Sequence, residues 1–229
     1  MFSEIAGSYD LANRLLSFGT DVGWRKKAVE AVKPQVGQEV LDMCCGTGDV
    51  AITFAKVQPG LKRVVGCDFS KTMVELAQQK QAKLTQDGEP GFENFQWCQG
   101  DCLATEFDDG SFDVVSCAFG LRNMVDLSAG LKEMHRVLKP NGRVCILEFS
   151  LPSNILSRCV YLLYFHFVLP VIGGAISGKF GAYRYLVTSV RKWDREVDLA
   201  GALEQAGFGE VKVLPLTLGI AKIHIACKR

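Results

Sequence analysis

The stretch Glu39-Val-Leu-Asp-Met-Cys-Cys-Gly-Thr-Gly48 decides the fold, because a short apolar strand runs directly into a glycine-rich turn. A helical pattern over residues 49–57 follows the turn, and a second apolar strand covers residues 63–67. A strand, a crossover helix and another strand make a parallel βαβ unit. The stretch therefore predicts an α/β fold with a parallel sheet.

The same alternation continues along all 229 residues. Asp21, Ser70 and Asp194 are placed to cap helices that end at residues 32, 84 and 206, and another helix covers residues 126–138. A turn is predicted at Pro140-Asn-Gly142. The remaining strands are predicted at residues 95–98, 112–118, 143–149, 211–214 and 220–227. Because no helix separates the last two strands, they should pair antiparallel, which gives a doubly wound, mostly parallel sheet.

The composition narrows the classes of partner. The 26 Lys and Arg residues nearly balance 25 Asp and Glu residues, so no strong positive field favours nucleic acid. The nine cysteines are an odd number without a CxxC pair, so neither a disulfide framework nor a metal site is expected. The first ten residues have no basic and apolar pattern of a secretory signal. We therefore expect a cytoplasmic protein.

Residues 159–176 are the most apolar part of the chain, with His166 as the single ionisable side chain. Pro170 and the Gly173-Gly174 pair interrupt this part, which leaves a strongly apolar helix over residues 159–169. A helix of that length covers roughly 15 Å, about half of a hydrocarbon core. We expect a buried or interfacial helix rather than a membrane span.

Polar or glycine-rich residues follow four successive predicted strands. They are Gly46-Thr-Gly48, Asp68, Asp101 and Phe119-Gly-Leu-Arg-Asn123. In a doubly wound sheet, ligands bind at the carboxyl ends of the strands, so these residues should form one site.

The glycine loop alone leaves two kinds of ligand open, because Gly46-x-Gly48-x-x-Ala51 also fits a dinucleotide fingerprint. However, Asp42 precedes the loop and no Lys or Arg lies in it, which disfavours a pyrophosphate. Asp68 follows Gly48 by twenty residues, the spacing at which a carboxylate binds ribose hydroxyls. The pattern favours a cationic adenosine cofactor, while the alternative is that the aspartates only cap the elements that follow them.

A wider set of motifs runs through nearly the whole chain. The motifs are Phe2-x-x-Ile-Ala-x-x-Tyr-Asp10, Ser17-Phe-Gly19 with Trp24, Leu41-Asp-x-x-x-Gly-Thr-Gly-Asp49, Phe119-Gly-Leu-Arg-Asn123, His135-Arg-Val-Leu-Lys-Pro140, Leu147-Glu-Phe-Ser150, Tyr183-Arg-Tyr-Leu186 and Ala206-Gly-Phe208. Together they resemble the UbiE/MenG-type quinone C-methyltransferases of menaquinone and ubiquinone biosynthesis, which are class I S-adenosylmethionine-dependent methyltransferases. The segments 119–123 and 183–186 are the most particular to this family.

The resemblance implies a seven-stranded Rossmann-like sheet with a helical substrate-covering insert. It also implies methyl transfer from S-adenosylmethionine to a ring carbon of a polyprenylated hydroquinone, with S-adenosylhomocysteine as the product. Cys44-Cys45 replaces the more frequent Ala-Gly-type residues and resembles the naphthoquinone branch, so demethylmenaquinol is the expected acceptor. A benzoquinol, another aromatic or terpenoid acceptor, and a nonenzymatic adenosine-binding subunit stay open as alternatives.

The resemblance places the family's cofactor-binding positions at the predicted strand ends and in the N-terminal segment. Tyr9 and Asp10 are expected to cover the cofactor, Asp101 stands where the family often has an asparagine, and Ala118 stands where a serine is common. The expected cofactor-binding residues are Tyr9, Asp42, Gly46, Thr47, Gly48, Asp68, Phe69, Asp101, Cys102 and Ala118.

Arg122 and Asn123 are the expected catalytic residues. A hydroquinone hydroxyl has a pKa of about 10, like that of tyrosine. When the hydroxyl is deprotonated, the adjacent ring carbon becomes nucleophilic. A fixed Arg122 guanidinium could stabilise the developing oxyanion and order a water that takes the proton, while Asn123 holds the other ring oxygen. His166 and His224 are alternative bases.

The chain is expected to be one domain, residues 1–229. It divides into an N-terminal helical cap (1–36), a cofactor-binding core (37–150), a helical insert that faces substrate and membrane (151–193) and a C-terminal part (194–229). In the insert, Lys179 and Arg184 could meet lipid phosphates beside glycine hinges at Gly173-Gly174 and Gly178. Reversible peripheral contact with a membrane is expected, and a homodimer stays open.

Overall fold

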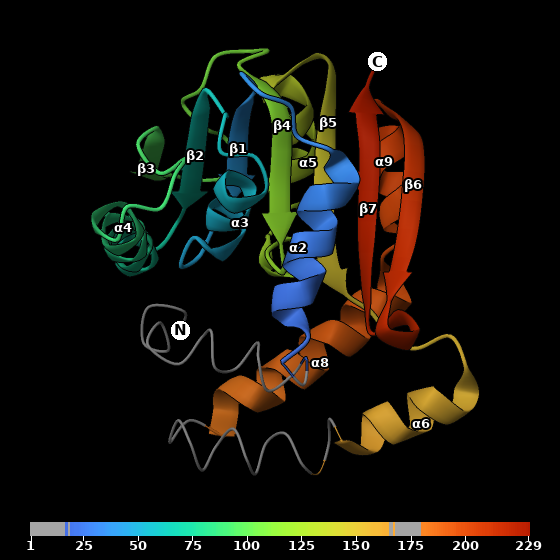
Figure 1. Ribbon diagram of the computed structural model, residues 1–229. Coiled ribbons are helices and arrows are strands. Elements are labelled where there is room, and N and C mark those ends of the chain that lie inside the picture. The colour runs from blue at the N-terminus through green and yellow to red at the C-terminus, as the bar shows by residue number, and fades with distance from the viewer. Residues whose placement is uncertain (1–16, 18, 165–166, 168–179) are drawn as a thin grey trace.

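One seven-stranded sheet forms the centre of the computed structural model, which describes residues 17, 19–164, 167 and 180–229. The strand order is β3-β2-β1-β4-β5-β7-β6, and β7 alone runs against its neighbours (Figure 1). This order confirms the predicted doubly wound sheet with an antiparallel hairpin at its end. The strands are β1 Glu39–Met43, β2 Arg63–Asp68, β3 Phe95–Gln99, β4 Phe112–Ala118, β5 Leu138–Phe149, β6 Phe208–Leu216 and β7 Ala221–Lys228.

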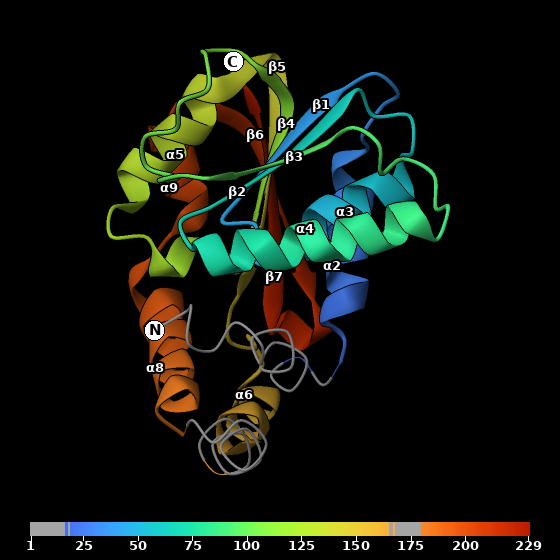
Figure 2. The same ribbon diagram turned by 90° about the vertical axis from the view of Figure 1, so that its left-hand side faces the viewer.

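Helices cover both faces of the sheet. Figure 2 shows α2 and α3 on one side and α5 and α9 on the other, while α4 packs against β2 and β3. Helices α6 and α8 lie beyond the carboxyl ends of the parallel strands (Figure 1). The helices are α2 Asp21–Val32, α3 Asp49–Val57, α4 Lys71–Gln86, α5 Leu127–Val137, α6 Ile155–Leu163, α8 Phe180–Glu196 and α9 Leu199–Gln205, with 3-10 turns η1 Leu121–Asn123 and η3 Thr217–Gly219.

The sheet separates two apolar cores because alternate strand residues point to opposite faces. In β1, fully buried Val40 belongs to the core under α2 and α3, whereas Leu41 belongs to the core under α5 and α9. Both faces are buried, which explains why the strands read as nearly continuous apolar runs.

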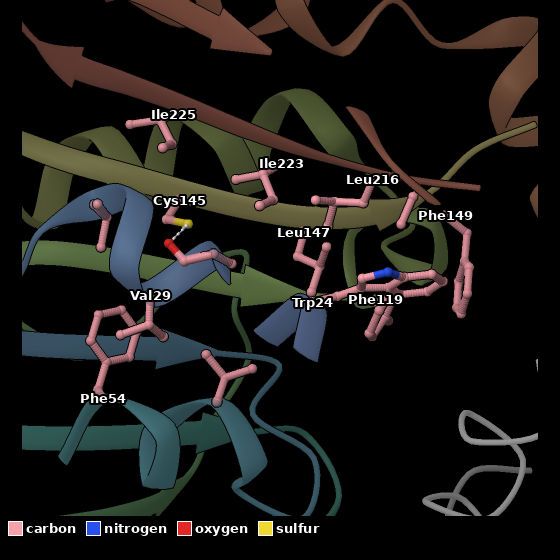
Figure 3. Close-up of a cluster of buried hydrophobic side chains, with 14 of the residues drawn as sticks. Trp24, Val29, Phe54, Phe119, Cys145, Leu147, Phe149, Leu216, Ile223 and Ile225 are labelled. Carbon is pink, nitrogen blue, oxygen red and sulfur yellow. Dashed lines mark hydrogen bonds between the residues drawn. The ribbon is translucent and has the colours of Figure 1, made fainter. Parts of the chain in front are cut away.

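An aromatic cluster closes the first core at the carboxyl end of the strands (Figure 3). Phe119 stacks on Phe149 with ring centroids 4.4 Å apart, and Trp24 of α2 meets Phe149 edge-on at 6.1 Å. Figure 3 also shows the Cys145 thiol donating to the Ala28 carbonyl, over 3.4 Å. These contacts join α2, β4 and β5 where the predicted site lies.

Two predicted caps are wrong. Thr20 occupies the N-cap of α2, and Asp21 lies inside the first turn, buried against Arg25 at 2.5 Å. Asp194 lies within α8 and accepts a hydrogen bond from the Leu151 backbone, while Asp198 caps α9. In both places a long-range or ion-pair contact outweighs the local preference of aspartate for the cap.

The predicted turn at Pro140-Asn-Gly142 is instead a bulge within β5, which begins at Leu138. Phe112 pairs with Leu138, and Val114 pairs with Arg143. One residue of β4 therefore lies opposite the longer segment 139–142 of β5, which forms the bulge. Asn141 takes a left-handed conformation (φ 63°), which an asparagine tolerates better than most side chains.

The apolar helix of the insert begins earlier than the sequence predicts. Asn154 caps α6, which starts at Ile155 rather than at residue 159. His166, residues 168–169 of the predicted apolar helix, the three glycines at 173, 174 and 178, and Lys179 lie outside the described residues. In the described part of the chain, no helix has the length and apolar character needed to cross a membrane. The division of the chain into cap, core, insert and C-terminal part stays a prediction.

Candidate active site

The glycine loop between β1 and α3 is shaped by its own backbone. Cys44, Gly46 and Gly48 all have positive φ (54°, 54° and 82°), and the Cys45 N–H donates to the Cys67 carbonyl of β2 over 3.0 Å. A Cβ at Gly48 would lie 2.5 Å from the Trp97 ring, so no larger residue fits there. The loop is therefore held close against β2 and β3.

Asp68 ties this loop to the end of β2. Its Oδ2 accepts the Gly46 N–H over 2.8 Å and its Oδ1 accepts the Ser70 N–H over 2.9 Å. Burial raises the pKa of Asp68, although these two hydrogen bonds act in the opposite direction. Each carboxylate oxygen keeps a second lone pair for a ribose hydroxyl. Phe69 follows it with 77% of its surface exposed, as a flat apolar face beside the carboxylate.

Asp42 lies beneath the loop rather than at its surface, with 1% of its surface exposed. Its Oδ1 accepts a hydrogen bond from the Ser116 hydroxyl over 2.7 Å, and its buried Oδ2 has no partner among the described residues. Burial raises the pKa of Asp42 to about 7. Its expected role in cofactor binding stays a prediction.

Two cations reach the loop from distant helices, which sequence reasoning missed. Lys80 of α4 donates hydrogen bonds to the Thr47 hydroxyl and to the Asp49 carboxylate, and each donor–acceptor distance is 2.8 Å. Arg25 of α2 lies 3.5 Å from Asp49 and pairs with buried Asp21. No local pattern signals these contacts, because α2 and α4 meet the loop only in the folded chain. Since acidic partners balance both cations, the setting still does not favour a pyrophosphate.

The residues after β3 complete the same edge of the sheet. The Gly100 N–H donates to the Asp68 carbonyl over 3.0 Å, which places the exposed Asp101 beside the end of β2. Asp101 also accepts the Leu103 N–H over 2.9 Å. Cys102 is buried and its sulfur accepts the Cys44 N–H over 3.3 Å. Its thiol therefore supports the loop from below, and only its backbone is left to meet a ligand.

Residues 119–123 pack directly on the glycine loop. Phe119 is buried with a positive φ of 58°, which is uncommon for a bulky side chain and marks a strained strand end. A Cβ on Gly120 would lie 2.6 Å from the Cβ of Cys44, so glycine alone permits this approach. The strand ends of β1 and β4 are brought together here, and Ala118 is partly buried beside them.

Arg122 is held by Glu148 of β5, a partner that the sequence reading assigned no role. Nη1 of Arg122 donates to Glu148 Oε1 and to the Phe119 carbonyl, and each donor–acceptor distance is 2.6 Å. The Arg122 side chain is 3% exposed and the Glu148 side chain 2%. Its guanidinium lies 5.3 Å from the Phe149 ring centre. The Nε–H is buried and has no acceptor among the described residues. The available signal was a single glutamate within the apolar strand Val144–Phe149.

The other predicted catalytic residues divide between two places. Asn123 donates to the Phe119 carbonyl over 3.3 Å, so it shares an acceptor with Arg122. His224 of β7 lies behind the site in a cavity of about 210 Å³ that Glu148 also lines, and burial lowers its pKa to about 4. Tyr9, Asp10 and His166 lie outside the described residues.

Comparison with known proteins gives consistent matches over the whole length. The sequence model of the ubiE/COQ5 methyltransferase family matches residues 1–228. The demethylmenaquinone methyltransferase of Thermus thermophilus is 44% identical over 225 residues, with 98% of each chain covered. The ubiquinone/menaquinone biosynthesis C-methyltransferase UbiE of Geotalea uraniireducens is 45% identical over 234 residues, covering all of this chain and 94% of the other.

Solved structures support the fold alone, since their sequence identity is low. An S-adenosylmethionine-dependent methyltransferase of Thermotoga maritima superposes with a TM-score of 0.66 at 17% identity, covering 100% of both chains. The phosphoethanolamine N-methyltransferase 2 of Haemonchus contortus, in complex with S-adenosylmethionine, gives a TM-score of 0.63 at 17% identity and covers 89% of this chain and 52% of its own.

The position of Asp68 predicts the effect of its removal on cofactor binding. Asp68→Ala should weaken S-adenosylhomocysteine binding at least about tenfold, because a charged hydrogen bond to ribose contributes roughly 1.5–3 kcal/mol. Calorimetric titration measures this affinity, with Asp87→Ala, at an exposed position after α4, as the matched control. Unchanged affinity in a folded Asp68→Ala protein would contradict the assigned role.

The buried Asp42 predicts a pH-dependent stability. Its pKa is about 7 in the folded chain against a reference value of 3.8, so the folded state binds this proton more tightly. The stabilisation is complete below about pH 4 and is lost as the pH rises through about 7, by at most a few kcal/mol. Urea unfolding measured between about pH 4 and pH 7 should show that the free energy of unfolding falls less with rising pH in Asp42→Asn than in the wild type.

Asp87→Asn, at an exposed position after α4, is the matched control for this measurement. Identical pH profiles for the wild type and Asp42→Asn would show that Asp42 does not carry the effect.

Proposed function

The chain belongs to the ubiE/COQ5 methyltransferase family, and from this premise we propose that its acceptor is a polyprenylated naphthohydroquinone, demethylmenaquinol, which it converts to menaquinol. It is an S-adenosylmethionine-dependent methyltransferase of quinone biosynthesis. The finer choice of a naphthoquinol is supported by the demethylmenaquinone methyltransferases among its full-length relatives, from Thermus thermophilus and Staphylococcus epidermidis.

The observation that carries the proposal is the approach of residues 119–123 to the glycine loop. Gly120 packs on Cys44, and two residues later Arg122 is clamped by buried Glu148. A loop suited to adenosine and a fixed cation beside it are the two parts that methylation of a hydroquinone carbon requires.

The residues of the loop fit the cofactor, which supplies the methyl group on a sulfonium. Asp68 offers free lone pairs to ribose hydroxyls, and the exposed Phe69 offers a flat face to a purine. Asp101 offers a carboxylate that can accept an amino hydrogen of adenine. The acidic side chains around the loop also suit a cation.

On the acceptor side, the task of the chain is to favour an oxyanion. A ring hydroxyl that loses its proton gains charge, and the fixed Arg122 guanidinium stabilises that charge without reorganising. Glu148 keeps the guanidinium in place, so the group is preorganised before the substrate binds. We assign Asn123 to the second ring oxygen and an Arg122-bound water to the departing proton.

Helix α6 supports contact with the membrane that holds the prenylated acceptor. Four apolar side chains of α6 and a fifth shortly after its end are 58–74% exposed, while Tyr161 is buried. They are Ile155, Leu156, Val160, Leu163 and Phe167. We term these residues the α6 apolar stripe. An amphipathic helix of this kind binds in the interface of a bilayer without crossing it.

We therefore propose a cytoplasmic enzyme that associates reversibly with the membrane surface. The prenyl chain of the acceptor would then stay in the bilayer while its ring enters the site. The contributions of Lys179 and the glycine hinges concern residues outside the described part. Arg184 lies within α8. A homodimer stays a prediction.

An assay with labelled S-adenosylmethionine and purified protein tests the proposed acceptor. We expect methylation of demethylmenaquinol in its reduced form, slower methylation of a ubiquinone-pathway benzoquinol and none of a simple phenol. A preference for the benzoquinol would refute the naphthoquinol proposal while leaving the family unchanged.

Arg122→Lys separates binding from chemistry. Lysine keeps the charge but loses the planar fork that bonds Glu148 and the Phe119 carbonyl. Turnover should fall at least about a hundredfold, while S-adenosylhomocysteine affinity stays within about threefold. Full turnover would mean that Arg122 is structural and that another group favours the oxyanion.

Flotation with anionic vesicles tests the α6 apolar stripe. Leu156→Glu/Val160→Glu should abolish weak vesicle association and should slow turnover of long-tailed acceptors more than of tail-less ones. Leu218→Glu, which charges an apolar residue that is 76% exposed outside α6, is the matched control. Equal losses for both kinds of acceptor would argue against membrane delivery through α6.

A further inference from the structure

Cysteines gather around the glycine loop from four different strands. The nine cysteines are all free thiols, and six of them lie at or beside the ends of β1, β2, β3 and β4. Those six are Cys44, Cys45, Cys67, Cys98, Cys102 and Cys117. The proposed reaction uses none of these thiols.

The thiols form a connected series. The Cys44 thiol interacts with the thiols of Cys102 and Cys117, and the Cys102 thiol donates to the Cys67 carbonyl at a donor–acceptor distance of 3.9 Å. Cys67 lies directly opposite Cys98 in the register of β2 and β3. No group of His, Cys, Asp and Glu side chains in the described chain is arranged to hold a metal ion. The series is therefore a set of reduced thiols in mutual contact.

One pair in this series is suited to oxidation. Cys44 is half-buried and follows β1, and Cys102 is buried and follows β3, so both lie outside the strands themselves. Their approach is direct, since the Cys44 N–H donates to Cys102 Sγ with a donor–acceptor distance of 3.3 Å. By contrast, Cys67 lies within β2, which is paired with a strand on each side.

We propose that Cys44 and Cys102 form a reversible oxidation site, at which hydrogen peroxide converts the two thiols to a disulfide. Cys102 thiolate attacks one peroxide oxygen and the O–O bond breaks, which yields a sulfenic acid on Cys102 and, with one proton, the first water. The Cys44 sulfur then attacks the Cys102 sulfur, the S–O bond breaks, and the hydroxide released takes the Cys44 thiol proton to become the second water. Two thiols are oxidised and one peroxide is reduced.

The surroundings of Cys102 suit it to the first step. Hydrogen bonds from the thiols of Cys44 and Cys67 and from the Cys44 N–H lower the pKa of Cys102, whereas the contacts of Cys44 with Cys102 and Cys117, together with burial, raise the pKa of Cys44. The thiolate is the form that attacks peroxide, so Cys102 is the nucleophile and Cys44 is the resolving thiol.

The disulfide would distort the cofactor side of the site. A sulfur–sulfur bond is about 2.05 Å long, so forming it shifts Cys102 Sγ away from its place beneath the Cys44 N–H. Cys44 precedes Gly46 by two residues and Cys102 directly follows Asp101. Both strand ends assigned to adenosine would move together. This consequence rests on the proposed function, whereas formation of the disulfide does not.

The experiment uses protein carrying Cys159→Ala, because Cys159 is exposed on α6 and could link two molecules. The protein is treated with hydrogen peroxide, free thiols are blocked, and the linked peptides are identified by mass spectrometry. S-adenosylhomocysteine affinity is measured before and after treatment. We expect a Cys44–Cys102 link, at least about tenfold weaker binding, and full recovery with dithiothreitol.

Two variants keep the test specific. Peroxide treatment should change the S-adenosylhomocysteine affinity of the Cys102→Ala variant by no more than about twofold, whatever its affinity before treatment. If Cys102→Ala does not fold, Cys44→Ala takes its place. Cys98→Ala, outside the pair, should still lose affinity. The proposal is overturned if the treated protein lacks the Cys44–Cys102 link, if the linked protein binds normally, or if Cys102→Ala loses as much affinity. Reduced protein that does not bind the cofactor would instead count against the proposed function.

Discussion

The buried ion pair between Arg122 and Glu148 is the constraint on which the acceptor side depends. Two charges this far from water cost several kcal/mol to desolvate, and their attraction offsets this only when the remaining donors and acceptors are satisfied. Here the Phe119 carbonyl and the Arg122 and Phe149 backbone amides satisfy most of these groups, and the Arg122 Nε–H alone keeps no acceptor among the described residues. The pair thereby links β4 to β5. It also holds the strained Phe119 backbone, and that places Gly120 against the glycine loop.

The cofactor side relies on backbone geometry rather than on side-chain charge. Positive φ angles turn the loop back on β1, and Asp68 fastens it by accepting the Gly46 amide. The cations that approach, Arg25 and Lys80, are balanced by Asp21 and Asp49. A site built in this way presents amides, a carboxylate and an aromatic face to one nucleoside. The thiols beneath it fill space between strands as small apolar groups do.

The sequence predicted what depends on local pattern. The periods of the apolar residues located all seven strands, and the spacing of Gly48 and Asp68 predicted that the two would meet, which the hydrogen bond from the Gly46 amide to Asp68 bears out; their role in binding a nucleoside stays a prediction. The parts that it missed depend on contacts between distant segments. Glu148 is one charged residue in an apolar strand, and nothing nearby in sequence shows that Arg122 reaches it. Asp42 is buried because β1 pairs with β4, where Ser116 lies opposite it. Asp194 does not cap a helix because its carboxylate accepts a hydrogen bond from the Leu151 backbone, which is distant in sequence.

The most direct test of this arrangement is a double-mutant cycle on turnover, with Arg122→Lys, Glu148→Gln and the double variant, each checked for folding and for S-adenosylhomocysteine affinity. If Glu148 acts by holding the guanidinium, Glu148→Gln alone should lower kcat at least about tenfold with little change in affinity. The double variant should then be hardly slower than Arg122→Lys, because the two residues act as one unit. Full turnover in Glu148→Gln, or losses that simply add, would contradict the proposed role of the buried pair.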